Sequence, residues 1–112
     1  MLSFQRLDVY RCAIEFLALT AALADEVPRG NAALLDQLRR AAISIPLNIA
    51  EAAGRTGKAD AARAYAIARG SAMECAAALD AMLLLKIVDG GRKQYADELL
   101  ERVVAMLTKL CR

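Results

Sequence analysis

The side chains best suited to chemistry are a hydroxyl and a carboxylate, Ser71 and Glu74, in the stretch AYAIARGSAMECAAAL. At helical spacing they share one face, where a nucleophile and an acid-base group could stand side by side. The chain contains no histidine, however, and no metal-ligand cluster or glycine-rich phosphate loop accompanies the pair. We therefore expect no enzyme activity, with no catalytic residue, metal, cofactor or small-molecule substrate.

A second polar set lies in the stretch RRAAISIPLNIAEAAGR. At 100° per residue, its members fall within about 80° of one another on a helix. They are Gln37, Arg40, Ser44, Asn48, Glu51 and Arg55. The spacing of four residues predicts an ion pair between Glu51 and Arg55. Ser44 and Asn48 are expected to form a hydrogen bond with each other or with a backbone carbonyl freed at the Pro46 kink. Two interpretations stay open: a solvated face with internal salt bridges, or a stripe that orders a subunit contact or receives a ligand.

Glu74 lies in an otherwise apolar row, where an unpaired carboxylate would be costly if it were buried. We therefore expect an arginine partner for it, with Arg39, Arg40 and Arg69 as the candidates. Together with Ser44, Asn48, Glu51 and Ser71, Glu74 is interpreted as a structural or interface residue.

The positive charge is unevenly distributed along the chain. The formal net charge is only +2, yet the segment 37–70 carries six basic residues against Glu51 and Asp60. The six are Arg39, Arg40, Arg55, Lys58, Arg63 and Arg69. They are candidates for nucleic-acid binding, because guanidinium groups contact phosphates in bidentate fashion. A pI near 8.5 is nevertheless low for a dedicated nucleic-acid domain.

These residues have to be positioned by helices, because the apolar spacing is helical throughout and no strand pattern is visible. Four helical segments are separated by Pro28–Gly30, by the pair Gly54 and Gly57, and by Asp89–Gly91. Asn31 is the expected N-cap of the second segment. Short loops between helices predict one all-α domain over residues 1–112, an up-down-up-down four-helix bundle.

Each segment has an expected core seam. The four seams are Leu7, Tyr10, Ile14, Leu17, Ala21 and Ala24; Leu34, Leu38, Ala42, Ile45 and Ile49; Tyr65, Ala68, Ala72, Cys75, Leu79 and Met82; and Ala96, Leu99, Val103, Met106 and Leu110. Pro46 interrupts the second seam without shifting its phase. We therefore expect one continuous helix, kinked at Pro46, at a cost of about 3 kcal/mol that packing offsets.

The chain is more apolar than one small bundle can bury. Its hydrophobic fraction is 58%, against about 45–50% in soluble domains, and the third segment has a second apolar row through Ile67, Ala78, Ala81 and Leu85. Exposed apolar surface of this extent predicts a homo-oligomer. No apolar run is long enough to span a membrane, so we expect a cytoplasmic protein with no membrane contact. The spacing of the three cysteines suits neither a disulfide framework nor a zinc site. We expect buried thiols that act as small hydrophobic side chains, with an exposed position at the tail as the alternative for Cys111.

The stretches LDQLRRAAISIPLNIAEAAGR and AYAIARGSAMECAAAL resemble the four-helix-bundle family encoded in intervening sequences of bacterial 23S ribosomal RNA genes. The family pattern reads approximately QLRRAAxSIxxNIAEGxGR and then FLxIAxGSxxE. The opening FQRLDVYRCAIEF is similar to the first helix of that family, so the resemblance covers nearly the whole chain. Two departures are Ala52, where the family favours glycine, and Tyr65, where it favours phenylalanine.

The resemblance implies a left-handed bundle assembled as a ring of five subunits. It also implies kinship with the accessory protein of diversity-generating retroelements, which binds a reverse transcriptase and RNA. It defines no catalytic residue. The expected function is a non-enzymatic, pentameric module that binds RNA or a ribonucleoprotein partner through a basic surface around the end joining the second and third helices. The alternative is a structural or protein-docking scaffold without nucleic-acid binding.

Overall fold

Alanine-rich segments with apolar residues three and four apart form four α-helices in the computed structural model, which describes residues 1–112. The helices are α1 (Asp8–Ala24), α2 (Ala32–Gly54), α3 (Lys58–Leu84) and α4 (Gly90–Leu110). A short 3-10 helix, η1 (Ser3–Arg6), precedes them. The chain contains no strand, so the predicted all-α four-helix bundle is confirmed.

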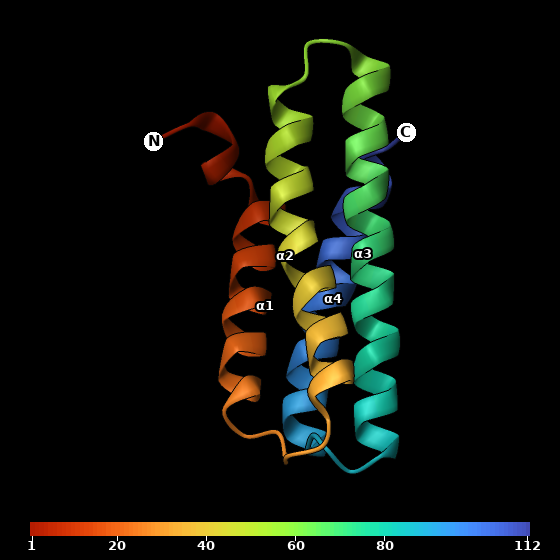
Figure 1. The fold of residues 1–112 in the computed structure, drawn as a ribbon. Helices are drawn as coiled ribbons and strands as arrows, with labels where there is room; N and C mark the ends of the chain where they lie inside the picture. The colour runs from red at the N-terminus through yellow and green to blue at the C-terminus, as the bar shows by residue number, and fades with distance from the viewer.

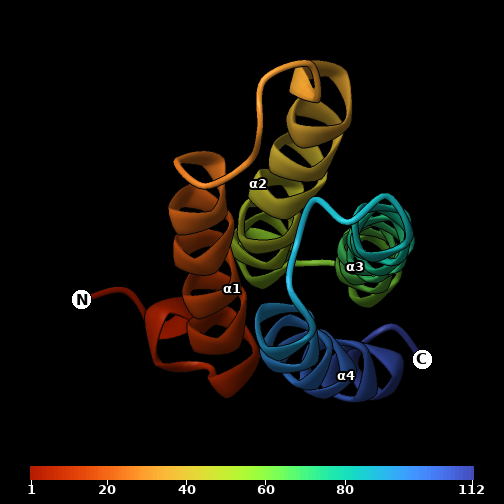
Figure 2. The same ribbon diagram turned by 90° about the horizontal axis from the view of Figure 1, so that it is seen from below.

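The loops between helices alternate between the two ends of the molecule. The α1–α2 and α3–α4 connections lie at one end and the α2–α3 connection lies at the other (Figure 1). Each helix packs against its neighbours in the chain, and α1 also packs against α4. Seen along the bundle, the four helices therefore surround one core, with α2 and α4 on opposite corners (Figure 2).

The helix ends follow local sequence signals. Asp89 caps α4 by accepting a 2.8 Å hydrogen bond from the backbone N–H of Arg92, as expected for an acidic N-cap residue. Asn31 is at the N-cap position of α2, but its side chain instead donates to the backbone oxygen of Pro28. The predicted N-cap position of Asn31 is therefore confirmed, but its side chain forms no capping hydrogen bond and faces the preceding turn instead.

Pro46 lies in the interior of α2, and the helix runs through it from Ala32 to Gly54 without a break. Its ring is buried, and so are the neighbouring seam residues Ile45 and Ile49. Apolar contacts around the ring offset the hydrogen bond that proline cannot donate. The prediction of one continuous helix rather than two is confirmed.

The core confirms the expected seams of α2 and α3 but not that of α1. On α1 the buried residues are Val9, Cys12, Ala13, Phe16, Leu19, Thr20 and Leu23. Ile14 and Ala21, which belong to the predicted seam, are exposed. This prediction is wrong because α1 is apolar on two faces, and packing against α2 and α4 turns the face with Phe16 inward. On α4 the predicted Leu110 is exposed, while Leu100 and Leu107 are buried.

None of the helices is both long and apolar enough to cross a bilayer. The molecule is a rod of 44 × 25 × 21 Å, and a rod exposes more surface than a sphere of equal mass.

Candidate nucleic-acid interface

The candidate interface lies where α2 ends and α3 begins. Arg55 follows the last residue of α2 in extended conformation, and Gly57 precedes the first residue of α3. This short turn places Arg55, Lys58 and Arg63 at one end of the bundle, as predicted. All three side chains are exposed.

Two carboxylates lie among these basic side chains. The guanidinium of Arg55 donates to Glu51 at 2.5 Å, which confirms the predicted ion pair. Glu51, Arg55, Asp60 and Arg63 line a shallow cavity of about 300 Å³, and Ile67 contributes an apolar wall. Both partners of the ion pair are half exposed, so the pair contributes at most a few tenths of a kcal/mol. The net charge at this end of the bundle is therefore less positive than the net charge of the whole segment 37–70.

Lys58 and Arg63 form no ion pair within the chain. They flank the first turns of α3, whose unpaired backbone N–H groups carry the positive end of the helix dipole. Lys58 and Arg63 are therefore the cations of this end that are free to meet an external phosphate.

The other three predicted basic residues lie elsewhere. Arg39 and Arg40 are exposed on α2, about 22–24 Å along the axis from Arg55 at 1.5 Å per residue. Arg69 donates from its Nε to the hydroxyl of Thr108 at 2.9 Å, and so it links α3 to α4. The structure thus brings together three of the six predicted residues and separates the rest.

The hydroxyl-bearing residues of the polar stripe form a network between α2 and α3. Ser44 Oγ lies 2.8 Å from Ser71 Oγ. Asn48 Nδ2 donates to Ser44 Oγ at 3.0 Å and to the backbone oxygen of Ser44 at 2.8 Å. The predicted Ser44–Asn48 hydrogen bond is confirmed, and Ser71 joins it from the next helix. All three side chains are half-buried, so the network fixes the register of the two helices.

Glu74 does not take part in this network. Its side chain is exposed, and no arginine of the chain forms an ion pair with it. The expected arginine partner is therefore wrong for a single chain. Water solvates the carboxylate directly, which removes the desolvation cost that motivated the expectation.

The cysteines are packing residues rather than reactive groups. All three are free, and Cys12 and Cys75 are buried. Burial, with a smaller contribution from the charge of Glu74, raises the pKa of Cys75 to about 12. Burial also raises the pKa of Cys12. At neutral pH both remain protonated and behave as small hydrophobic side chains.

Residues 5–109 match the sequence model of the 23S rRNA-intervening sequence proteins. The chain belongs to this family. The match includes all four helices and the residues of the polar network and of the α2–α3 end. Among curated proteins, none matches the chain significantly.

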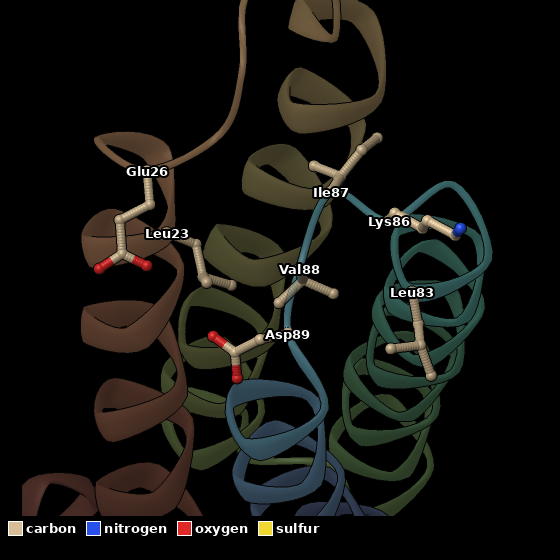
Figure 3. Close-up of a pocket in the computed structure, with 7 residues that line it drawn as sticks. All are labelled: Leu23, Glu26, Leu83, Lys86, Ile87, Val88 and Asp89. Carbon is tan, nitrogen blue, oxygen red and sulfur yellow. The ribbon is translucent and has the colours of Figure 1, made fainter.

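This 23S rRNA-intervening sequence protein also has a cavity that its sequence did not indicate, at the end opposite Arg55. It measures about 470 Å³ and lies between the end of α1 and the α3–α4 loop, where Ile87 and Val88 contribute apolar walls (Figure 3). Its carboxylates are already engaged: Glu26 pairs with Arg92 at 2.6 Å, and Asp89 caps α4. The ammonium of Lys86 points away from both (Figure 3).

Two cross-helix contacts of the chain, and one ion pair within α4, were likewise not expected. Lys93 on α4 pairs with Asp80 on α3 at 2.9 Å, and with Asp97 on its own helix at 2.5 Å. Tyr95 on α4 donates to Glu15 on α1 at 2.5 Å. The spacing of four residues could have indicated the Lys93–Asp97 pair. Spacing along one helix gives no signal for the two cross-helix contacts, because they depend on how neighbouring helices are rotated. They hold α4 against α3 and α1.

Proposed function

We propose that this protein is a non-enzymatic homo-oligomer whose α2–α3 end contacts RNA or a ribonucleoprotein partner. The homo-oligomer is inferred from apolar side chains that are exposed on the folded chain. Leu47 is 63% exposed, and Leu84 and Leu85 are 82% and 61% exposed. Monomeric proteins seldom expose contiguous apolar patches beyond a few hundred Å². Contact with further copies would remove this surface from water.

The nucleic-acid part of the proposal is supported by Lys58 and Arg63. Both are exposed and lack an ion pair, so neither side chain is held by a carboxylate of the chain. In a cyclic assembly, the same end of each subunit would repeat around a ring, which would strengthen the positive potential. Membership of a family named for ribosomal RNA intervening sequences is consistent with an RNA partner.

The test is the fluorescence anisotropy of a labelled RNA titrated with the full chain at several salt concentrations. We expect the logarithm of the association constant to fall linearly with the logarithm of salt concentration. Charge reversal of Arg55, Lys58 and Arg63 to glutamate should weaken binding and flatten that slope. A matched control reverses Arg11, Arg29 and Lys86, which are exposed, unpaired and outside the α2–α3 end. Equal binding by the two triple variants would reject the α2–α3 end as the interface.

The second candidate function is a protein-docking scaffold without nucleic-acid binding. It is favoured by the two carboxylates at the α2–α3 end, because Glu51 and Asp60 repel phosphates, and by Ile67, whose side chain is half exposed there. No RNA binding at low salt, together with a stable oligomer, would support this scaffold over the leading proposal.

The proposal also includes the handedness of the bundle, the order of its helices and a bend in α2. We infer a left-handed up-down-up-down bundle with a bend of α2 at Pro46. The alternating loops and the absent N–H of Pro46 support these features. Residual dipolar couplings should give different axis directions for residues 32–44 and 48–54, whereas one common direction would exclude the bend.

A further inference from the structure

An apolar groove runs between α3 and α4 on the outside of the bundle. It has a volume of about 350 Å³ and is lined mainly by Ala72, Met73, Ala76, Leu100 and Val104. Polar contacts close both ends: Lys93 with Asp80 at one, Arg69 with Thr108 at the other. Between them the small side chains of Ala76 and Ala105 leave the hollow open. We call this feature the α3–α4 groove.

The rim of the α3–α4 groove is acidic. Asp97 and Glu101, one turn apart on α4, both line it. Asp97 is engaged by Lys93, whereas Glu101 has no ion pair within the chain and is exposed. The groove therefore combines an apolar floor with unneutralised negative charge on one side.

A ridge of protruding apolar side chains, flanked by basic rather than acidic residues, lies on the outer face of α2. Ile43 and Leu47, one turn apart, are 45% and 63% exposed. Arg39 and Arg40 lie one turn before Ile43 on the same helix. At 100° per residue, they point about 50° to either side of the direction in which Ile43 and Leu47 project. Both arginines are exposed and lack an ion pair. We call these four residues the α2 ridge.

We propose that the α2 ridge of one copy docks into the α3–α4 groove of the next copy. This rests on the proposed homo-oligomer and deepens it by naming the two surfaces that meet. Ile43 and Leu47 are large and exposed, whereas Ala76 and Ala105 of the groove are small and reach the surface, so large side chains on one copy meet small ones on the other. The guanidinium groups of Arg39 and Arg40 then lie near the carboxylates of Asp97 and Glu101, which is the charge complementarity typical of specific interfaces.

The exposed area of the chain fits such a contact. Its accessible surface is 6694 Å², whereas a folded monomer of this mass, 12.0 kDa, is expected to expose about 6,000 Å². The excess, roughly a tenth of the total, is close to the 800 Å² or so that one partner contributes to a single interface of standard size, and a copy within a ring would cover a second surface of that size as well. Side-by-side association of rods is the arrangement that covers it.

The two surfaces are different and lie on different sides of the bundle, since α2 and α4 occupy opposite corners (Figure 2). A contact between unlike surfaces leaves the pair of copies with one unused ridge and one unused groove. Such heterologous contacts generate rings where the rotation between copies closes and open filaments where it does not, and an oligomer of finite size requires the closed form. The geometry thus favours a cyclic assembly in which Arg39 and Arg40 serve the subunit contact rather than RNA.

Complementary variants test this pairing by light scattering on the full chain. The ridge variant carries Ile43→Ser and Leu47→Asp, and the groove variant carries Glu101→Arg and Ala105→Arg. We expect each alone to be monomeric at concentrations where the unaltered protein is assembled. Mixed in equal amounts, they keep one intact ridge and one intact groove, so they should form a complex of one copy of each and stop there. The matched controls Leu2→Asp, at an exposed apolar side chain outside the ridge and the groove, and Glu98→Arg should keep the unaltered mass.

Exchanging the two charges of one proposed contact provides a second test, in which the apolar parts of the ridge and the groove stay unaltered. Arg40→Glu should weaken assembly about tenfold, as rim charges at interfaces do, and adding Glu101→Arg in the same chain should restore it. Circular dichroism confirms that each variant is folded. Ridge and groove variants that stay assembled, or a mixture that stays monomeric, would overturn the pairing while leaving the homo-oligomer intact. A monomeric unaltered protein would instead reject the homo-oligomer itself.

Discussion

The hydroxyl of Ser44 on α2 lies 2.8 Å from the hydroxyl of Ser71 on α3, twenty-seven residues later in the chain. With Asn48, which donates to Ser44, this contact is a polar connection between two helices whose other contacts are mainly apolar. Apolar packing alone tolerates small sliding of one helix against another, whereas a hydrogen bond specifies one register.

Ser71→Ala should destabilise the fold by about 1 kcal/mol, because it leaves the Ser44 hydroxyl with one partner fewer. The double variant Ser44→Ala with Ser71→Ala should cost less than the sum of the two single changes, since both partners of one contact are then absent. Urea unfolding of the four proteins measures both quantities. Strictly additive losses would show that the two hydroxyls are not coupled.

Phe16→Ala and Ile14→Ala test which face of α1 is inside. Phe16 is fully buried and Ile14 is 39% exposed. We expect Phe16→Ala to lower the free energy of unfolding by about 3–5 kcal/mol through the cavity it leaves. Ile14→Ala should cost about 1 kcal/mol or less, because its side chain gives up little burial. Thermal unfolding compares the two directly, and a larger loss for Ile14→Ala would mean that α1 is rotated.

This pair also shows how far the sequence alone could be interpreted. On α2 the large apolar residues recur on one face and polar residues interrupt the other, so the seam through Ile45 could be predicted. On α3 the seam through Leu79 was predicted as well, although a second apolar row lies beside it. On α1, Ile14 and Phe16 lie about 160° apart around the helix, on two apolar faces, and the pattern favours neither. The choice is made by packing against α2 and α4, which no local pattern records.

The candidate site shows the same division. Contacts within one helix, such as Glu51 with Arg55, follow from spacing and were predictable. Contacts between helices, such as Arg69 with Thr108, depend on the relative rotation of two rods. Glu74 was expected to be paired because its row is apolar, but that row turns far enough toward solvent that no partner is required.

Glu51→Gln should strengthen RNA binding if the proposed interface is correct. The change removes the carboxylate that holds Arg55 at 2.5 Å and frees that guanidinium for phosphate. The slope of the logarithm of the association constant against that of salt concentration should steepen by about one unit, as expected for one added phosphate contact. Anisotropy at three salt concentrations measures it, with Glu98→Gln as the control distant from the end.

Lys93 makes the fold sensitive to alkaline pH. Hydrogen bonds to Asp97 and then to Asp80 raise the pKa of Lys93 above its ordinary 10.5. A cation whose pKa is raised by folding stabilises the fold fully below the unfolded value and loses that contribution as pH rises through the folded one. The free energy of unfolding should therefore decline above pH 10.5, and more steeply than in Lys93→Met. Parallel pH profiles for the two proteins would contradict this role.

The most direct test of the account is the molar mass of the purified chain by static light scattering across a range of protein concentrations. If exposed apolar side chains such as Leu47 drive self-association, the mass should be a constant multiple of 12.0 kDa down to micromolar concentration. A single species of 12.0 kDa under those conditions would contradict the central claim.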